Sequence, residues 1–257
     1  MSRIFITGSA DGLGQMAARL LVKGGHQVVV HGRNETRSSE ALDAVPGAEA
    51  AVHGDLSSIA AAREVAEQVN RLGHFDAVIH NAAVGYVEPR RIETVDGLSH
   101  LFAVNTLAPY ILTALIAKPK RLVYLSSALH RGGDASLEDL NWDFRPWEGT
   151  AAYSDSKFHD ALLASAIARR WPEVLSNALE PGWVATKMGG ASAPDDLAQA
   201  PATQVWLATS DDARACVTGG YFYHMRPRET HPAVHDATVQ DRLIEACEKF
   251  SGIALPA

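Results

Sequence analysis

The chain has 257 residues, 47% of them hydrophobic, and a formal net charge of −7 at pH 7. This apolar content is enough for one sizeable core, and the acidic balance without a basic run argues against a nucleic-acid partner. No apolar run reaches membrane-spanning length, and a first strand expected from Arg3 leaves no room for a signal peptide, so we expect a cytoplasmic protein with no membrane partner.

Short apolar runs alternate with segments of helical spacing. The runs expected to form strands are Arg3–Thr7, Gln27–His31, Ala50–His53, Ala77–His80, Arg121–Ser126, Asn177–Glu180 and Gly219–Tyr223. The segments expected to be helical are Gln15–Lys23, Ile59–Leu72, Gly97–Ile116, Ala152–Arg170 and Val239–Phe250. This alternation predicts a single α/β domain spanning residues 1–257. We expect a doubly wound (Rossmann) parallel sheet of about seven strands, helices on both faces, and ligands beyond the carboxyl ends of the strands.

Three segments fit the alternation poorly: residues 129–150, residues 188–201 and the tail from residue 224. Long loops inside a compact domain are usually functional or mobile. We expect the first two to form walls of a substrate cleft, and the tail to cover either the active site or an interface. In the first segment, Trp142, Phe144 and Trp147 either line an apolar pocket or pack the loop onto the core.

A glycine-rich turn follows the first expected strand and opens the first expected helix. It contains Gly8, Gly12 and Gly14. Glycines let the backbone approach a phosphate closely, and a helix amino terminus favours negative charge. The alternative is an ordinary tight turn. The position of the turn favours a dinucleotide site.

The end of the second expected strand bears on which dinucleotide is bound. An acidic residue there would bind the ribose 2′-hydroxyl of NAD(H), but the chain has Gly32 followed by Arg33. A guanidinium suits a 2′-phosphate, so we expect NADP(H) rather than NAD(H) as the cofactor. Asp55, after the third strand, could accept a hydrogen bond from the adenine amine or cap the helix that starts near Ser57 or Ser58.

Tyr153 and Lys157 are four residues apart in an expected helix. Side chains at this spacing lie on one face of a helix, where the ammonium favours phenolate and lowers the pKa of the phenol. Such a phenol can exchange a proton with a substrate hydroxyl or carbonyl oxygen. Together with a dinucleotide site, this pair indicates hydride transfer at a C–OH/C=O centre.

The chain resembles the short-chain dehydrogenase/reductase family, and the resemblance extends from Thr7 to about Tyr223. The matching motifs are Thr-Gly-x3-Gly-x-Gly at Thr7–Gly14, Asp55-Leu56, Asn81-Ala82-Ala83, Asn105, Ser126-Ser127, Tyr153-x3-Lys157 and Pro181-Gly182-x3-Thr186. The order of several independent motifs makes the resemblance specific. One departure is Ala83, where the family usually has glycine, so a methyl group stands beside the expected cofactor.

The resemblance implies a role for each of four catalytic residues. Tyr153 is the general acid in reduction and the general base in oxidation, and Ser127 rather than Ser126 hydrogen-bonds the reacting oxygen. Lys157 binds the nicotinamide ribose and lowers the pKa of the tyrosine. Asn105 holds a water that links Lys157 to solvent, although Asn105 could also be only a hydrogen-bonding residue within its helix.

The motifs also imply the cofactor contacts, with Asn81 beside the adenosine-side ribose and Val184 and Thr186 at the carboxamide. Thr186 could instead be a helix cap. The residues expected around the cofactor are Gly8, Ser9, Gly12, Leu13, Gly14, Arg33, Asn34, Asp55, Leu56, Asn81, Ala82, Ala83, Tyr153, Lys157, Pro181, Gly182, Val184 and Thr186.

A finer resemblance is to the retinol-dehydrogenase-like branch of the family. It rests on Ser126-Ser127 followed by His130, on Asp139-Leu140-Asn141, and on Ala152–Lys157. The branch is often membrane-associated and this chain has no hydrophobic anchor, so we expect small or medium lipophilic alcohols, aldehydes and ketones rather than a retinoid. The candidate substrate contacts are Trp183, Met188 and His130.

Other groups of residues suggest no additional chemistry. The histidines of the tail have no partner set at metal-ligand spacing, so no metal is expected. Cys216 and Cys247 are read as buried small apolar residues in a reducing compartment. The family commonly forms homodimers or homotetramers, which we expect here. Two alternatives to an enzyme of this kind are a non-catalytic dinucleotide-binding redox sensor and a sugar-nucleotide epimerase. The first usually lacks the tyrosine or the lysine, and the second needs a longer chain.

Overall fold

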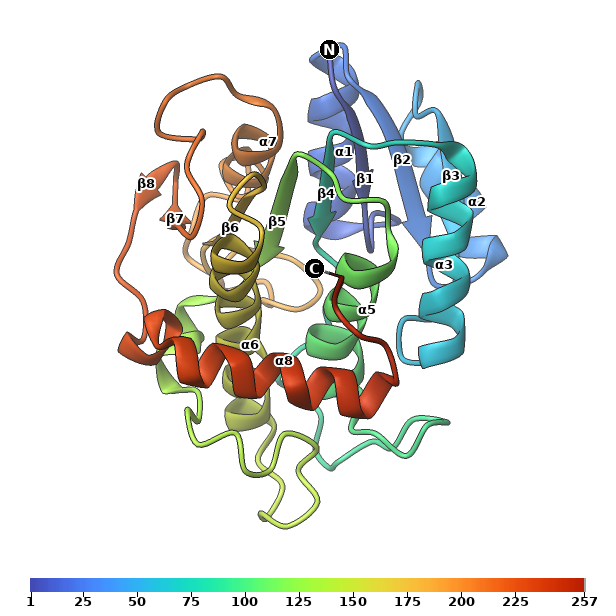
Figure 1. Cartoon of the computed structure of the whole chain (residues 1–257). Helices are drawn as coiled ribbons and strands as arrows, with labels where there is room; N and C mark the ends of the chain where they lie inside the picture. The colour runs from blue at the N-terminus through green and yellow to red at the C-terminus, as the bar shows by residue number, and fades with distance from the viewer. Residues whose placement is uncertain (257) are drawn as a thin grey trace.

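The computed structural model describes residues 1–256, and its strands form one sheet in the order β3-β2-β1-β4-β5-β6-β7-β8 (Figure 1). The strands are β1 (Arg3–Ile6), β2 (Gln27–Gly32), β3 (Ala50–His53), β4 (Ala77–His80), β5 (Arg121–Leu125), β6 (Leu175–Glu180), β7 (Tyr221–Tyr223) and β8 (Arg226–Pro227). The first seven strands pair in parallel, and only β8 is antiparallel to its neighbour. The predicted doubly wound sheet is confirmed, with one short strand added at its edge.

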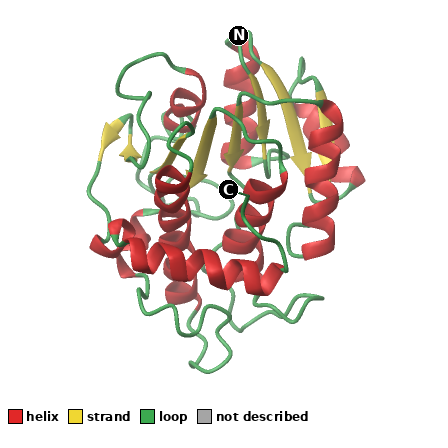
Figure 2. Ribbon diagram, in the orientation of Figure 1, coloured by secondary structure: helices red, strands yellow, loops and turns green. Residues whose placement is uncertain are grey.

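Helices cover both faces of the sheet (Figure 2). They are α1 (Gly12–Lys23), α2 (Glu35–Ala44), α3 (Ile59–Leu72), α4 (His100–Phe102), α5 (Ala108–Leu115), α6 (Gly149–Arg170), α7 (Ala202–Thr209) and α8 (Ala237–Ser251). The helices α3, α5 and α6 lie on one face, with α8 crossing α5 and α6, and α1, α2 and α7 lie on the other (Figure 1). Among these elements, no helix is both long enough and apolar enough to span a membrane.

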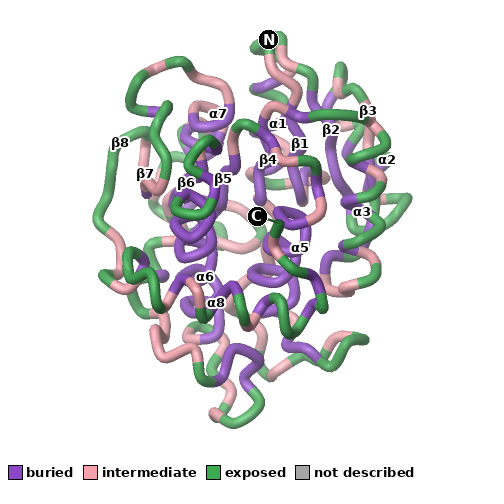
Figure 3. Tube along the Cα trace, in the orientation of Figure 1, coloured by how far each residue is buried: buried purple, intermediate pink, exposed green. Residues whose placement is uncertain are grey.

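The core consists of two apolar layers separated by the sheet. Figure 3 shows buried residues along the strands and the helices that pack on them. Successive side chains of a strand point to opposite faces. Accordingly, Phe5 and Val29 belong to the layer under α3, α5 and α6, whereas Ile4, Ile6 and Val28 belong to the layer under α1 and α7. Burial on both faces explains why the strands are continuous apolar runs rather than alternating ones.

The strand order reverses between β1 and β4, because β2 and β3 lie on one side of this pair and β5 to β8 on the other. In an open parallel sheet, the carboxyl ends at such a reversal splay apart and leave a crevice for ligands. The glycine turn follows β1, and the Asn81-Ala82-Ala83 segment follows β4. The fold therefore brings these two sequence motifs to the same crevice.

Two helices were not anticipated from the sequence, α2 and α7. The outer helix α2 is mostly polar, and only Ser38 and Ala41 are buried, so its apolar periodicity is weak. In addition, the predicted helix Gly97–Ile116 is divided, because a π-helical turn, Ala103–Leu107, joins α4 to α5. Isolated π turns inside helices are frequently found at functional sites.

The tail from residue 224 forms a hairpin and a docked helix. The hairpin between β7 and β8 turns at His224 and Met225, whose φ angles of 48° and 59° define a left-handed two-residue turn without glycine. A groove of about 660 Å³ lies between this hairpin and the start of α7. The predicted helix Val239–Phe250 is confirmed as α8.

Candidate active site

The glycine turn brings backbone close to backbone. Gly8 and Gly12 have φ angles of 60° and 55°, in the region that favours glycine. A Cβ atom on Gly8 would lie 2.7 Å from the Cα of Ala82, and one on Gly14 would overlap the side-chain amide of Asn81. Glycine is therefore required at these points. The turn leads into α1, whose first N–H groups can bind a phosphate.

His31 holds the glycine turn through hydrogen bonds of its ring, a role that was not predicted from the sequence. Its Nδ1 accepts the N–H of Gly8 at 3.0 Å, and its Nε2 lies 3.0 Å from the carbonyl oxygen of Gly54. These partners assign the ring hydrogen to Nε2. Burial lowers the pKa of His31 to about 4, so the ring is neutral. Ser9 is also structural, because its hydroxyl donates to the carbonyl of Ile6 and accepts the N–H of His31.

The segment after β4 is tied to the glycine turn through Thr7 and Asn81. The Thr7 hydroxyl accepts the N–H groups of Asn81 and Ala82, and the Asn81 side-chain amide donates to the carbonyls of Thr7 and Gly8, all at 3.0 Å. Asn81 therefore fixes the relative position of two chain segments. The methyl group of Ala83 is accommodated in a half-buried position.

The end of β2 explains why no acidic residue stands there. A Cβ atom on Gly32 would overlap the backbone of Arg37 and Ser38 in the first turn of α2, so no side chain fits. Arg33 follows with an exposed side chain. Asn34 caps α2 by accepting the N–H of Arg37 at 2.9 Å.

At the end of β3, the cap of α3 is Ser58 and not Asp55. Asp55 is exposed, and its carboxylate accepts the N–H of Ser57 at 3.0 Å. The adenine contact considered for Asp55 stays a prediction. Leu56 is buried and packs into the core, and Leu13 is half-buried in the first turn of α1.

Asp11, in the glycine turn, joins two basic side chains that the sequence did not single out. Its Oδ2 lies 2.7 Å from an Arg37 nitrogen and 2.8 Å from Lys187 Nζ. The hydrogen bond from Lys187 is the largest cause of a lowered pKa at Asp11. Because Asp11 is about half exposed, this link contributes little to stability. It does connect α2, the glycine turn and the segment after β6 at the mouth of the site.

Tyr153 and Lys157 lie on one face of α6, with the Lys157 ammonium 5.7 Å from the centroid of the Tyr153 ring. Both residues are buried. The ammonium donates to the carbonyl of Leu125 at 2.8 Å and to the carboxylate of Asp160 at 2.7 Å. Lys157 is therefore anchored to the end of β5 and paired with a carboxylate one turn further along the helix.

The pKa of Tyr153 is raised rather than lowered. Burial is the largest cause, and it outweighs the positive charge of Lys157, which acts in the opposite direction. The nearby Ser127 side chain also lowers the pKa of Tyr153, whereas the carboxylate of Asp160 raises it. The predicted effect of Lys157 on this pKa is right in direction, and it is outweighed by burial, whose depth the sequence does not reveal.

The two serines after β5 have different environments. The Ser126 hydroxyl is buried and donates to the carbonyl of Lys157 at 2.7 Å. Ser127 caps a short 3₁₀ turn, Ala128–Gly132, by accepting the N–H of Leu129 at 3.3 Å, and its side chain lies close enough to Tyr153 to favour the phenolate. Ser127 and Tyr153 converge although 26 residues separate them in the chain.

Asn105 occupies the centre of the π turn and is fully buried. Its side-chain oxygen accepts the N–H of Val84 at 2.8 Å, and its nitrogen donates to the carbonyl of Val84 and the hydroxyl of Ser156, both at 3.0 Å. The side chain thus links α6 to the segment after β4. The water that the resemblance places at Asn105 stays a prediction.

The Pro181-Gly182 turn after β6 is held by Asp195, which sequence reasoning missed. Asp195 accepts the backbone N–H of Trp183 at 2.6 Å. Gly182 has a φ of 91°, and a Cβ atom at this position would overlap the Asp195 carboxylate. Val184 is buried and bridges to Asp195. Thr186 accepts the N–H of Gly189 at 3.1 Å, which closes the loop on itself.

The side chains that meet the Tyr153 phenol come from two segments. Its hydroxyl lies 3.8 Å from the Met188 sulfur, and its ring meets the edge of Tyr86 at 5.5 Å between centroids. Met188 was expected at this end of the site, and Tyr86 was not. Trp183, about half exposed, donates its indole N–H to the carbonyl of Gly189.

His130 is buried and is not a surface polar residue, and the substrate contact expected for it stays a prediction. It is completely buried, its Nδ1 lies 2.7 Å from the carbonyl oxygen of Ser127, and its Nε2 accepts the N–H of His231 at 3.3 Å. Burial lowers its pKa to about 4. His130 therefore supports the 3₁₀ turn that carries Ser127.

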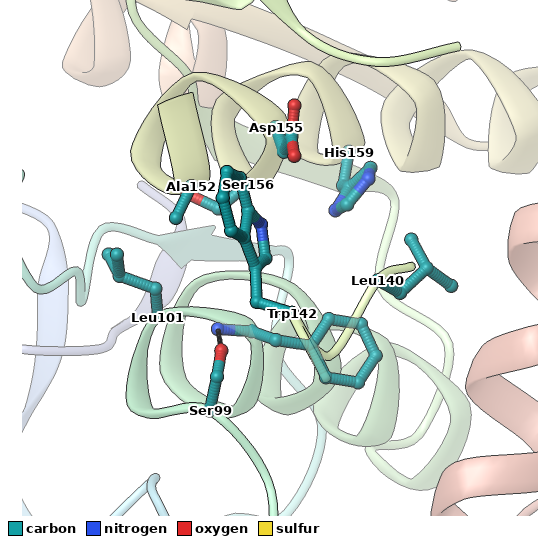
Figure 4. Close-up of a pocket in the computed structure, with 9 residues that line it drawn as sticks. Ser99, Leu101, Leu140, Trp142, Ala152, Asp155, Ser156 and His159 are labelled. Atoms are coloured by element: carbon teal, nitrogen blue, oxygen red, sulfur yellow. Dashed lines mark hydrogen bonds between the residues drawn. The ribbon is translucent and has the colours of Figure 1, made fainter. Parts of the chain in front are cut away.

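The loop before α6 packs onto α4 and α6. Figure 4 shows Trp142 between Leu101 and the helix face formed by Ala152, Ser156 and His159. The crevice between them leaves no room for a water molecule. Trp147 packs edge-on against Trp142 and donates its indole N–H to the carbonyl of Glu88, whereas Phe144 is exposed. Of the two interpretations, packing onto the core describes both tryptophans.

No cluster of side chains among residues 1–256 has the composition of a metal site.

A sequence profile described as short chain dehydrogenase matches residues 2–130. An uncharacterized oxidoreductase of Emericella nidulans is 46% identical over 261 residues, covering 100% of this chain and 99% of that protein. The short-chain dehydrogenase chry4 of Gibberella zeae is 40% identical over 261 residues, covering 100% of both. Human retinol dehydrogenase 13 is 27% identical over 288 residues, covering 99% of this chain and 86% of that protein.

Solved structures share the fold. A protein from Mycobacterium paratuberculosis superposes with a TM-score of 0.87 at 26% identity, covering 100% of this chain and 96% of that chain. A blue fluorescent protein from a metagenomic library, solved in complex with NADPH, superposes with a TM-score of 0.68 at 21% identity, covering 86% and 95%.

Proposed function

Because the chain belongs to the short-chain dehydrogenase family of oxidoreductases, we propose that it transfers a hydride between NADP(H) and a carbonyl or alcohol substrate, with Tyr153 as general acid and base. The observation that carries this proposal is the grouping of Tyr153, Ser127 and Lys157 at the carboxyl end of β5, on the same edge of the parallel sheet as the glycine turn after β1. Proton exchange and cofactor binding are thereby possible at one crevice.

The glycine turn fits a dinucleotide. Gly8 and Gly14 let the turn pack directly against Ala82 and Asn81, and the space beside Gly12 is open where α1 begins with its first N–H groups. The turn, Arg33 and the loop of Pro181–Thr186 would hold the cofactor. A bound nicotinamide supplies the hydride, and the protein supplies positioning and electrostatics.

The protonated phenol of Tyr153 suits the reductive direction. Since its pKa is raised, it carries its proton at neutral pH and can donate it to a carbonyl oxygen. The Ser127 hydroxyl offers that oxygen a second hydrogen bond. The ammonium of Lys157 then stabilises the phenolate that is left.

The preference for NADP(H) is supported by Arg33 and by the absence of space for a side chain at Gly32. The basic residues Arg37 and Lys187 stand near the same entrance. A guanidinium pairs well with a phosphate. A related fold that was solved with NADPH is consistent with this choice.

The substrate class follows from the surroundings of the phenol. Met188 and Tyr86 contact Tyr153, and Trp183 stands half exposed beside them. These side chains present apolar and aromatic surface, so the proposed substrates are small or medium lipophilic ketones, aldehydes and alcohols.

Replacing Tyr153 with Phe tests the function. The ring and its packing remain, but the proton donor is lost, so turnover of a carbonyl substrate should fall by about two orders of magnitude or more while NADPH still binds. Steady-state rates and nicotinamide fluorescence titrations measure the two quantities. The matched control is Tyr110→Phe, which removes a buried hydroxyl that donates to the carbonyl of Ile253 in the tail rather than facing Tyr153.

Near-normal turnover in Tyr153→Phe would exclude the assigned role. Tight NADPH binding by the unaltered protein with no turnover of any carbonyl compound would instead favour a redox sensor.

A further inference from the structure

Lys157 and Asp160 form a buried ion pair inside α6. They are one helical turn apart, each side chain is 3% exposed, and Nζ lies 2.7 Å from Oδ2. The Lys157 ammonium also faces the ring of Tyr153 at 5.7 Å. The Lys157 ammonium, which acts on the Tyr153 phenol, is therefore paired with the carboxylate of Asp160. No role described above involves Asp160.

The groups around this pair are otherwise neutral at pH 7. From β5, Tyr124 faces Asp160, and burial together with this carboxylate raises the pKa of Tyr124. From β4, His80 stacks on Tyr124, and burial lowers the pKa of His80 to about 3. Tyr86 faces Tyr153 from the segment after β4. Among the described residues that face the phenol, the two charges of the pair thus dominate.

The charges of the pair act on Tyr153 in opposite directions. Lys157 lowers the pKa of Tyr153, and Asp160 raises it. An ammonium and a carboxylate in contact act at a distance as a dipole, whose potential falls off faster than that of a single charge. The ionised carboxylate therefore cancels part of the benefit that Lys157 gives to the phenolate.

We propose that Asp160 is a positioning residue that holds the Lys157 ammonium and limits its effect on Tyr153, and that it thereby sets the pH range in which the phenol gives up its proton. The consequence for turnover rests on the proposed function, whereas the consequence for the phenol does not. Burial raises the pKa of Asp160 to about 6 against the pull of Lys157, which places a change in its charge near neutral pH.

The test is Asp160→Asn. The amide has the same shape and its oxygen can still accept the Lys157 hydrogen bond, but the negative charge is gone. The ionisation of Tyr153 should move down by about one pH unit, the lower end of the effect of a neighbouring charge. Phenolate absorbance measures it, with the Tyr153→Phe form of each protein subtracted to remove the other five tyrosines of the six in the chain.

The matched control is Asp155→Asn, because Asp155 is a buried carboxylate of the same helix that pairs with Arg145 instead of Lys157. In Asp155→Asn, Tyr153 should ionise at the same pH as in the unaltered protein. If Asp160→Asn does not fold, Asp160→Ser removes the same charge and should shift the phenol in the same direction. If Tyr153 in a folded Asp160 variant ionises at the same pH as in the unaltered protein, or at a higher pH, the proposal is overturned.

The pH profile of kcat/KM for alcohol oxidation gives the second readout. In Asp160→Asn, the lower limb of this profile should move to lower pH by the same amount as the ionisation of Tyr153. The profiles of the unaltered protein and of Asp155→Asn should coincide. If the unaltered protein turns over no alcohol or carbonyl compound, the proposed function fails and the absorbance titration still tests Asp160. If turnover depends on Tyr153 but neither readout moves in Asp160→Asn, only the inference about Asp160 fails.

Discussion

Arg33 and Arg37 differ in their partners although both lie near the entrance to the nucleotide site. The Arg37 guanidinium is engaged by Asp11 and Glu40, whereas the Arg33 side chain is exposed at the end of β2. An arginine that already has two carboxylates loses those contacts when it binds a phosphate. At the scale of single residues, Arg33 is the better candidate to bind the 2′-phosphate.

Arg33→Ala should therefore weaken NADPH binding much more than NADH binding. A hydrogen bond to a charged group contributes about 1.5–3 kcal/mol, so we expect a loss of roughly one to two orders of magnitude in NADPH affinity. Fluorescence titrations with both nucleotides measure the difference, and Arg37→Ala is the comparison variant. Equal weakening of NADPH and NADH would mean that Arg33 does not contact the 2′-phosphate.

At the scale of elements, Arg145 attaches the loop before α6 to that helix. Its guanidinium lies 2.8 Å from the Asp155 carboxylate, approaches Asp139 at 3.5 Å, and stacks on Trp142 at 3.9 Å. Asp139 in turn accepts three backbone N–H groups of the loop. The long insertion between Ser127 and Tyr153 is therefore an ordered element.

Arg145→Met should destabilise the protein, because it keeps most of the apolar stem but leaves the buried carboxylate of Asp155 without its cation. We expect a loss of about 3 kcal/mol in the free energy of unfolding at pH 7, measured by urea denaturation. The control is Arg71→Met, which breaks an exposed ion pair with Glu67 and should change stability by less than about 1 kcal/mol.

The pH dependence of this loss can be given a sign. Burial already raises the pKa of Asp155, and removing Arg145 raises it further. A carboxyl whose pKa is raised on folding destabilises the folded state while it is ionised, and this penalty disappears when the group takes up a proton. The difference between Arg145→Met and the unaltered protein should therefore narrow as the pH falls through the raised pKa of Asp155. If the difference in unfolding free energy between the two proteins does not change with pH, the destabilisation comes from lost packing and not from the charge of Asp155.

At the scale of the whole molecule, the tail completes the larger apolar layer. Leu243, Ile244 and Cys247 of α8 are buried in the same cluster as α3, α5 and α6. The last described residues continue this attachment, because the Tyr110 hydroxyl donates to the carbonyl of Ile253 at 2.7 Å. The chain from residue 224 onward is thus part of the domain core.

Leu243→Ala should lower the free energy of unfolding by about 2–5 kcal/mol, because it removes a fully buried side chain and leaves a cavity. Urea denaturation measures the loss. The control is Leu20→Ala on α1, where the side chain is 41% exposed and the loss should be much smaller. Similar losses at both positions would mean that α8 does not belong to the cooperative core.

Much of the fold could be predicted from the sequence because the signals are local. Apolar runs bounded by turns located the seven parallel strands, and motif order placed the glycine turn directly after the first of them. The helix α2 and the strand β8 were missed, because one is mostly polar and the other has two residues. Neither has a pattern long enough to detect.

The sequence by itself determined which residue types are present for the proposed hydride-transfer chemistry and which predicted strands they follow. Only the tertiary structure decided how those residues are charged and partnered: the raised pKa of Tyr153, the neutral His31 beneath the turn, and the carboxylate of Asp160 on Lys157. The physical reason is that residue type and spacing are properties of the chain, whereas the cost of a charge depends on burial and on neighbours from other elements.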